Sequence, residues 1–307
     1  MGEHLTQIRW GCACALIDGV KNLFSHYGLF GFKKLSKPLS DSVLNFAFLQ
    51  LFFYLISILL AIFYVNRSIK QTLTADSKIL DKITAYIIRS SFWAVLIVGL
   101  ADLLISFLVV EKLVEPLFGE YLKIKLVVPA FRITFVHFPL ILISFVVGYF
   151  TRSVGFIWLA VLVVASEFFI VLSRFIFEYE QAFQGDLVRF WYSALYLFAS
   201  AYALIHEGHV RVDVLYTGFS ERKKAWTNSI GSLIFGIPLC LIVLFLGMGG
   251  KASIINGPVI SFEITQQGSN GLYLLYLMAI YLAVFAVSML IQFTSYFMSS
   301  SDKLLKN

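Results

Sequence analysis

Long apolar stretches separated by short polar segments dominate the hydrophobicity pattern of this chain. Each stretch is continuous and close to 20 residues long, the length a helix needs to cross the hydrocarbon core of a bilayer. None shows the alternation of apolar and polar residues that is typical of strands in a membrane barrel. Seven stretches are therefore expected to form membrane-spanning helices, at roughly 43–65, 92–110, 133–150, 154–177, 187–205, 226–248 and 271–297.

Composition supports the same fold class. Of the 307 residues, 59% are hydrophobic and only 14% are charged, whereas a soluble domain carries about 25% charged residues. Helices and closed barrels are the structures that satisfy the backbone inside lipid. We therefore expect an all-α integral membrane protein with about seven transmembrane helices.

Charges between the spans predict the orientation. Segments 66–91 and 206–225 are rich in Lys and Arg, which places them in the cytoplasm. Segments 178–186 and 249–270 carry few basic residues and are expected outside. The basic residues of 1–42 conflict with this scheme, so this segment either breaks the rule, forms an interfacial helix or enters the membrane as an eighth segment. The net charge of +6 follows from these loops and calls for no nucleic-acid partner.

The most distinctive polar segment, HEGHVRVD at 206–213, lies between two spans. A zinc protease would need H-E-x-x-H, with the two histidines one helical turn apart. Here His206 and His209 are three residues apart, so the segment is interpreted as the polar end of a helix and not as a metal site. Three cysteines argue against a disulfide framework, and Cys240, inside an apolar span, is expected to be a packing residue.

Asp102 lies inside the apolar stretch 92–110. A carboxylate at that depth is costly, so it is expected to face protein or water and to have a partner. A hydrogen bond between helices is favoured over an ion or proton relay, and both interpretations stay open.

Charged residues of the fourth and fifth spans are candidate structural or subunit-interface residues. Glu167 and Arg174 are seven residues apart and should share one helix face, while Arg174 can also reach Glu178, four residues on. A pair of this kind joins helices or subunits more readily than it forms an ion pathway. Asp186 and Arg189 begin the fifth span and are candidates of the same kind.

Motifs of soluble enzymes are not evident. The chain shows no glycine-rich phosphate loop, no Ser/His/Asp arrangement and no paired carboxylates, so it is not expected to be an enzyme or to carry a cofactor. It also shows no clear inverted repeat of the kind that many complete transporters contain. These features indicate helices that pack against a partner.

The second half of the chain resembles the small membrane subunit, of DctQ type, of tripartite ATP-independent periplasmic (TRAP) transporters. The resemblance rests on a span that ends in SRFIF at 173–177, a span that contains YLFASAYAL at 196–204, and the HVRVD motif at 209–213. A basic segment, a third span, a polar external loop and a last span follow in the order typical of that family. The N-terminal half resembles the extended variety of this subunit.

The resemblance implies three segments: 1–42, 43–153 with two to three extra spans, and a DctQ-like four-helix domain at 154–307. It implies that this chain lies in a bacterial inner membrane with two protein partners. They are a large permease subunit and a soluble periplasmic substrate-binding protein that delivers an organic anion such as a carboxylate. The partner would use the sodium gradient, and this chain would brace the moving part. The extra spans either enlarge the interface or bind membrane lipid.

An interface hypothesis follows for the fifth span. Small residues at 199–201 would allow close helix packing, and His209, Arg211 and Asp213 would contact the large subunit. The alternative is a self-sufficient ion-coupled carrier that uses Asp102, Glu167 and Arg174.

Overall fold

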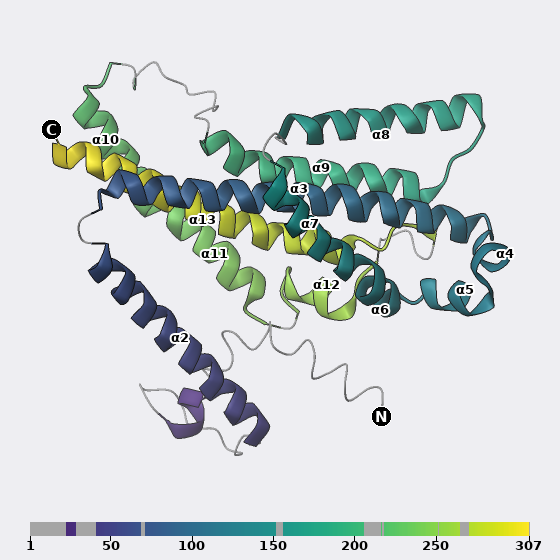
Figure 1. The fold of residues 1–307 in the computed structure, drawn as a ribbon, viewed down its shortest axis with the longest axis horizontal. Coiled ribbons are helices and arrows are strands. Elements are labelled where there is room, and N and C mark those ends of the chain that lie inside the picture. The colour runs from purple at the N-terminus through teal and green to yellow at the C-terminus, as the bar shows by residue number, and fades with distance from the viewer. Residues whose placement is uncertain are drawn as a thin grey trace.

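The computed structural model describes residues 23–28, 41–68, 71–151, 156–205, 216, 218–250, 252–264 and 270–306. Within these residues the chain forms helices joined by turns (Figure 1), which confirms the expected all-α class. In chain order the helices are α2 (Asp41–Arg67), α3 (Leu73–Val110), α4 (Val114–Phe118), α5 (Glu120–Leu126), α6 (Pro129–Arg132), η1 (Ile133–His137), α7 (Phe138–Phe150), α8 (Phe156–Ile176), α9 (Ala182–Ile205), α10 (Glu221–Ile230), η2 (Gly231–Gly236), α11 (Ile237–Met248), α12 (Asn256–Ser261) and α13 (Leu275–Lys306).

Among the described residues, six helical segments are long and apolar enough to cross a membrane. They are α2, α3, the run from α6 to α7, α8, the run from α10 to α11, and α13. The fifth expected span is present as α9, 24 residues long, although it is not among these six. Two of its polar side chains, Gln184 and Asp186, are buried against neighbouring helices.

Helix α3 is longer than the sequence pattern suggested. Residues 73–91, expected to lie in a cytoplasmic loop, continue without a break into the span at 92–110 and give a helix of 38 residues. The Thr72 side chain caps its first turn by accepting a hydrogen bond from the Ala75 amide. At 1.5 Å per residue the helix is about 57 Å long, so it extends well beyond a hydrocarbon core of about 30 Å.

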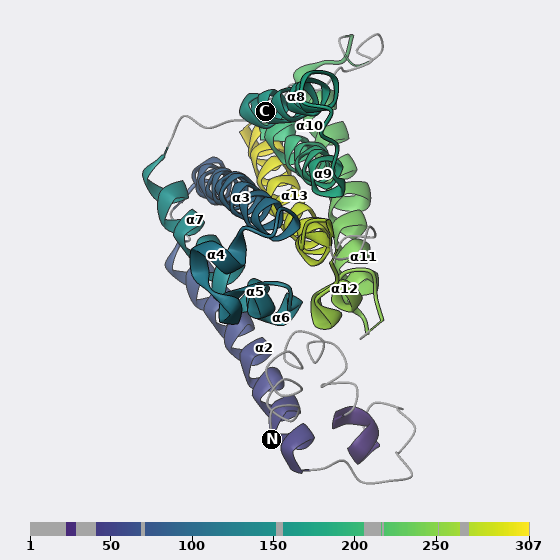
Figure 2. The same ribbon diagram turned by 90° about the vertical axis from the view of Figure 1, so that its right-hand side faces the viewer.

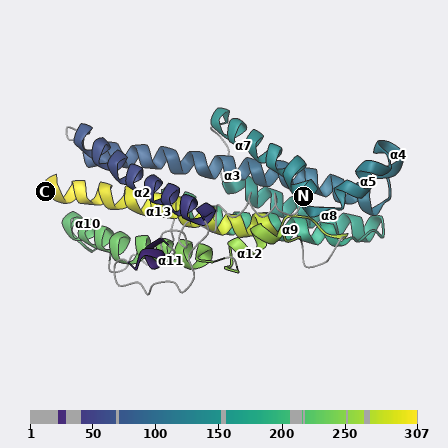
Figure 3. The same ribbon diagram turned by 90° about the horizontal axis from the view of Figure 1, so that it is seen from below.

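A row of polar side chains explains why the first half of α3 is helical. Ser295 of α13 donates a hydrogen bond to Asp81 at 2.6 Å, and Gln292 donates to the same carboxylate at 3.0 Å. Ser77 and Ser295 join their hydroxyl groups at 2.9 Å. These contacts fix α3 against α13 over the segment that precedes the apolar span, and the two helices lie side by side along the molecule (Figure 3).

Apolar residues of α3, α9 and α13 form the main core. Val95, Val98, Phe190 and Phe198 are fully buried there, next to the ring of Tyr281. A smaller cluster joins Ile88, Ala201, Cys240 and Met289. Cys240 is therefore a packing residue, as expected, and Ala201 faces the interior of this chain.

Two π-helical segments precede prolines. Segment η1 ends two residues before Pro139, and η2 ends two residues before Pro238. Proline has no amide hydrogen and so removes one helical hydrogen bond. A π-turn lets the preceding carbonyl groups find other amides, and such turns are frequent at functional sites.

Helices α2 and α8 lie at the edges of the fold. Figure 2 shows α2 extending away from the bundle, while α8 packs on α9 at the opposite side. Both present bulky apolar side chains to the surroundings, including Phe53 and Phe63 of α2 and Phe168 and Phe175 of α8. Such surfaces suit lipid or another membrane protein.

Helix α3 belongs to the N-terminal segment 43–153, yet it packs against α9 and α13 of the C-terminal segment. The two segments therefore share one core. The division of the chain near residue 153 stays a prediction, and the connection at 152–155 lies outside the described residues.

Candidate functional site: a buried charged cluster

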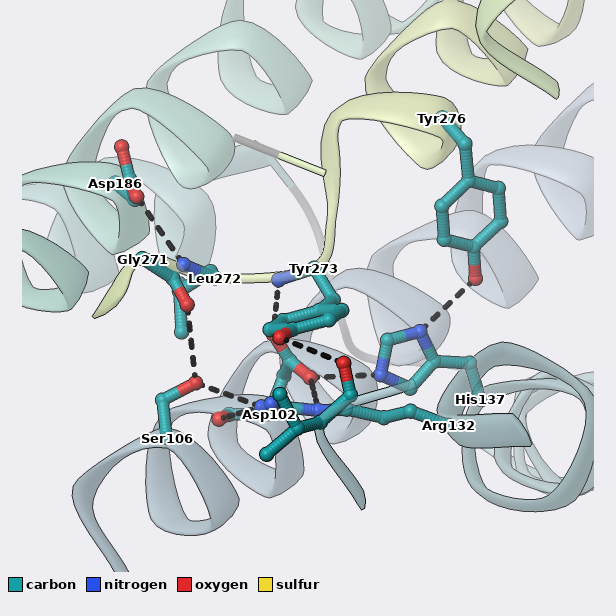
Figure 4. Close-up of polar contacts among 10 residues, drawn as sticks. Asp102, Ser106, Arg132, His137, Asp186, Gly271, Leu272, Tyr273 and Tyr276 are labelled. Atoms are coloured by element: carbon teal, nitrogen blue, oxygen red, sulfur yellow. Dashed lines mark hydrogen bonds and ion pairs between the residues drawn. The ribbon is translucent and has the colours of Figure 1, made fainter. Parts of the chain in front are cut away.

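The centre of the site is Asp102, which is fully buried on α3. Its Oδ1 atom lies 2.5 Å from the Arg132 Nε atom and 2.8 Å from the His137 Nε2 atom. Its Oδ2 atom accepts a hydrogen bond of 2.7 Å from the Tyr273 amide (Figure 4). Both carboxylate oxygens are thus occupied, which offsets the cost of holding the charge away from water.

Arg132 approaches from the end of α6 and is 1% exposed. Its Nη2 group donates to the Asp102 carbonyl and to the Ser106 hydroxyl, both at 2.7 Å. The guanidinium carbon lies 4.4 Å from the centre of the Tyr273 ring, within the range of a cation–π contact. One arginine therefore joins α6, α3 and the segment that leads into α13.

His137 ends the π-helical segment η1 and is fully buried. Its Nδ1 atom is 3.0 Å from the Tyr276 hydroxyl on α13. A neutral imidazole that donates from Nε2 to the Asp102 carboxylate leaves Nδ1 free to accept from that hydroxyl. In this tautomer each polar atom of the imidazole has a partner, and the ring bridges α3 and α13.

The chain just before α13 is held by two carboxylates in succession. The Leu272 amide donates to Asp186 of α9 at 3.1 Å, next to the Tyr273 amide that donates to Asp102. The Ser106 hydroxyl donates to the Gly271 carbonyl at 3.3 Å. Figure 4 shows these groups converging on the extended segment from α3 and α9. We call Asp102, Ser106, Arg132, His137, Tyr273 and Tyr276 the Asp102 cluster.

The contacts of the Asp102 cluster hold several helices together, which indicates a structural role. With a neutral imidazole the carboxylate and the guanidinium balance each other in charge. No group of three His, Cys, Asp or Glu side chains able to hold a metal ion occurs in the described part of the chain. The arrangement joins four elements, α3, α6, η1 and α13, at a depth where unpaired charges would be costly.

The expectation for Asp102 was correct in its main point. The residue has partners, and it makes hydrogen bonds between helices as the favoured interpretation required. The sequence reasoning missed Arg132 and His137, which lie at the boundary of an expected span. Their signal was available, because an arginine and a histidine five residues apart in the apolar run FRITFVHF are polar groups that need buried partners.

Asp186 and Arg189, two of the candidate structural residues, differ in their surroundings. Asp186 is buried and binds the Leu272 amide, whereas Arg189 is 61% exposed and lies 3.9 Å from it. The more important role of Asp186 is to hold the segment before α13.

For Arg174 the expected partner was wrong. Its Nε atom lies 3.4 Å from Glu180, beyond the end of α8, and both side chains are 61% exposed. Pairing with Glu167 or Glu178 was expected because those residues lie on the same helix face or one turn away. The helix ends at Ile176, which turns the chain so that Glu180 comes within reach. Glu167 is exposed on the outer face of α8.

His209, Arg211 and Asp213 lie outside the described residues, as do His206 and Glu207. Their role at a subunit interface stays a prediction.

A comparison with protein families places the second half of the chain. Residues 163–298 match the model described as tripartite ATP-independent periplasmic transporters, DctQ component. Neither the curated proteins nor the solved structures gave a match. The matched segment runs from α8 into α13 and contains Asp186, Tyr273 and Tyr276, whereas Asp102, Arg132 and His137 precede it. Residues 163–298, a little under half of the chain, are therefore similar to the DctQ component of the tripartite ATP-independent periplasmic transporters.

Proposed function

We propose that this protein is the non-catalytic small subunit of a TRAP-type secondary transporter in a bacterial inner membrane. In this role it braces a large permease subunit that moves during transport. The DctQ match over residues 163–298 is the observation that carries the proposal. The transported solute would be an organic anion of carboxylate type, delivered by a periplasmic binding protein and accumulated with the sodium gradient.

The internal contacts of the bundle support a bracing role. The Asp102 cluster joins α3 to the start of α13, and the contacts of Asp81 with Gln292 and Ser295 join α3 to the second half of α13. Two polar attachments on one pair of long helices resist sliding of one helix past the other. A rigid body of this kind suits a fixed wall against which a partner moves.

Apolar surfaces support a membrane partner. The faces of α2 and α8 expose aromatic side chains, and helices in lipid associate through close packing and hydrogen bonds. Either helix offers a surface for a large subunit. The segment with His209, Arg211 and Asp213 follows α9 and is proposed to contribute polar contacts to the same partner.

The test is sodium-driven uptake of a radiolabelled carboxylate mixture into liposomes. This chain is reconstituted alone, with the co-expressed large subunit, and with the large subunit plus the binding protein. We expect uptake in the complete system and none from this chain alone. Sodium-dependent accumulation by the chain alone would refute the bracing role.

A triple variant tests the polar segment. Replacing His209, Arg211 and Asp213 by alanine should reduce co-purification of the large subunit or reduce uptake. Replacing the nearby exposed Glu221 and Arg222 by alanine is the control and should change neither. An unchanged complex and unchanged uptake in the triple variant would exclude this segment from the interface.

The alternative of a self-sufficient carrier receives little support. Asp102 is held by Arg132 and His137 inside the bundle. Arg174 pairs with Glu180 on an exposed surface and Glu167 is exposed on α8, so these residues do not combine with Asp102 in the described contacts.

A further inference from the structure

A groove of about 380 Å³ runs between α7 and α13, with α3 as its floor. Figure 2 shows α3 lying between α7 and α13. The lining is mainly apolar and includes Ala94 of α3, Ile141 and Phe145 of α7, and Ile280 and Val284 of α13. Phe138 and Phe145, on its α7 side, are about half exposed, so the groove is open toward the surroundings of the bundle.

Two residues that line this groove have buried hydroxyl groups without a partner among the described residues. They belong to Ser90 of α3, 1% exposed, and Tyr281 of α13, 2% exposed. A buried hydroxyl without a hydrogen bond is costly. An unfilled apolar groove of this size also loses the contacts that its lining atoms would otherwise make. Both features indicate a ligand that combines an apolar body with a hydrogen-bond acceptor.

The dimensions match one acyl chain of a bilayer leaflet. The groove extends from Ile133 of η1 to Phe145 of α7, twelve residues apart in sequence, which corresponds to about 18 Å along a helix. One leaflet contributes half of a hydrocarbon core of about 30 Å, or about 15 Å. Its volume lies within the range of small-molecule sites, roughly 300–1,000 Å³.

Position along α3 indicates which end of the ligand is polar. The apolar stretch of α3 begins at Phe92, directly after Arg89, Ser90 and Ser91. Ser90 therefore lies at the edge of the hydrocarbon region, near the level of the ester carbonyl groups of phospholipids. The basic residues of the first half of α3 place this edge at the cytoplasmic leaflet.

From these observations we infer that the groove binds one phospholipid of the cytoplasmic leaflet. One acyl chain lies between α7 and α13, and an ester carbonyl accepts hydrogen bonds from the hydroxyl groups of Ser90 and Tyr281. Another transmembrane helix fits less well, because a groove of about 380 Å³ that is about 18 Å long is too narrow for a helix about 10 Å in diameter.

The experiment is native mass spectrometry of the full chain, stripped of lipid in detergent and titrated with dioleoylphosphatidylethanolamine. Ala94→Leu and Val284→Phe fill the groove from two different helices and should each remove one tightly bound lipid per chain. Tyr281→Phe removes one donor and should weaken that binding about three- to tenfold. Tyr192→Phe is the matched control, since Tyr192 is 56% exposed on α9 and does not line the groove.

Thermal unfolding gives a second measurement that separates a filled groove from an empty one. With lipid bound, Tyr281→Phe should lower the melting temperature. Added lipid should also raise the melting temperature of this variant by less than it raises that of the wild type. In an empty groove the same change removes an unpaired hydroxyl and should raise the melting temperature without changing the lipid count, which would overturn the inference. Equal lipid counts in the wild type and both groove-filling variants would also overturn it, as would loss of the large subunit from those variants with lipid retained.

Discussion

Arg132→Met is the sharpest test of the Asp102 cluster. The substitution keeps most of the side-chain volume and removes the charge. It deletes the ion pair to Asp102, the hydrogen bonds to the Asp102 carbonyl and the Ser106 hydroxyl, and the cation contact with the Tyr273 ring.

The expected cost follows from what the substitution leaves behind. Asp102 keeps its contacts with His137 and the Tyr273 amide but loses its cationic partner in a fully buried site. Breaking a buried pair by removing one partner costs about 3–5 kcal/mol, because the remaining charge is uncompensated. Adding Asp102→Asn removes that charge and retains an oxygen that can accept from the Tyr273 amide. The double variant should therefore be more stable than Arg132→Met by about 2 kcal/mol.

The assay is unfolding of the purified chain in mixed micelles with increasing dodecyl sulfate, followed by circular dichroism. Lys123→Met is the control. It breaks the ion pair between Lys123 and Glu115, and both of these side chains are about half exposed. The unfolding midpoint should stay unchanged, because exposed ion pairs contribute little to stability.

Two results would refute the reasoning. A cost below about 1 kcal/mol for Arg132→Met would mean that Asp102 is not a desolvated charge that depends on Arg132. A double variant less stable than Arg132→Met would mean that the carboxylate is needed for reasons other than pairing with this arginine.

Two further predictions concern a helix contact and Tyr179, which donates a hydrogen bond to Glu111 at the C-terminal end of α3. A Cβ atom at Gly148 would lie 2.6 Å from the Ser90 Oγ atom and 2.9 Å from the Ser90 Cα atom. In the same unfolding assay, Gly148→Ala should therefore destabilise the α3–α7 contact by about 1–3 kcal/mol. Gly185→Ala is the control; Gly185 has open space around it, so this change should be neutral or stabilising. Burial and the hydrogen bond to Glu111 raise the pKa of Tyr179 to about 12 from an ordinary value of about 10. The neutral phenol therefore favours the folded state, and this contribution, complete below about pH 10, is lost between about pH 10 and 12. Wild type should lose more stability over that interval than Tyr179→Phe, and equal losses would show that Tyr179 does not contribute.

The sequence determined the class of protein and indicated which family its second half resembles. Continuous apolar stretches near 20 residues leave helices as the way to satisfy the backbone in lipid, and the order of motifs from 173 to 213 is specific enough to indicate the DctQ family. The sequence also indicated that Asp102 has a partner, because the cost of a charge at that depth does not depend on which residue offsets it.

The tertiary structure decided which residues come together. Arg132 and His137 lie 30 and 35 positions from Asp102, and Tyr273 lies 171 positions away. Hydrophobic periodicity carries no information on such pairings, because it records which side of a helix is apolar and not which helix lies opposite. The continuity of α3 was missed for a similar reason, since its polar residues resemble a loop until the polar face of α13 supplies their hydrogen bonds.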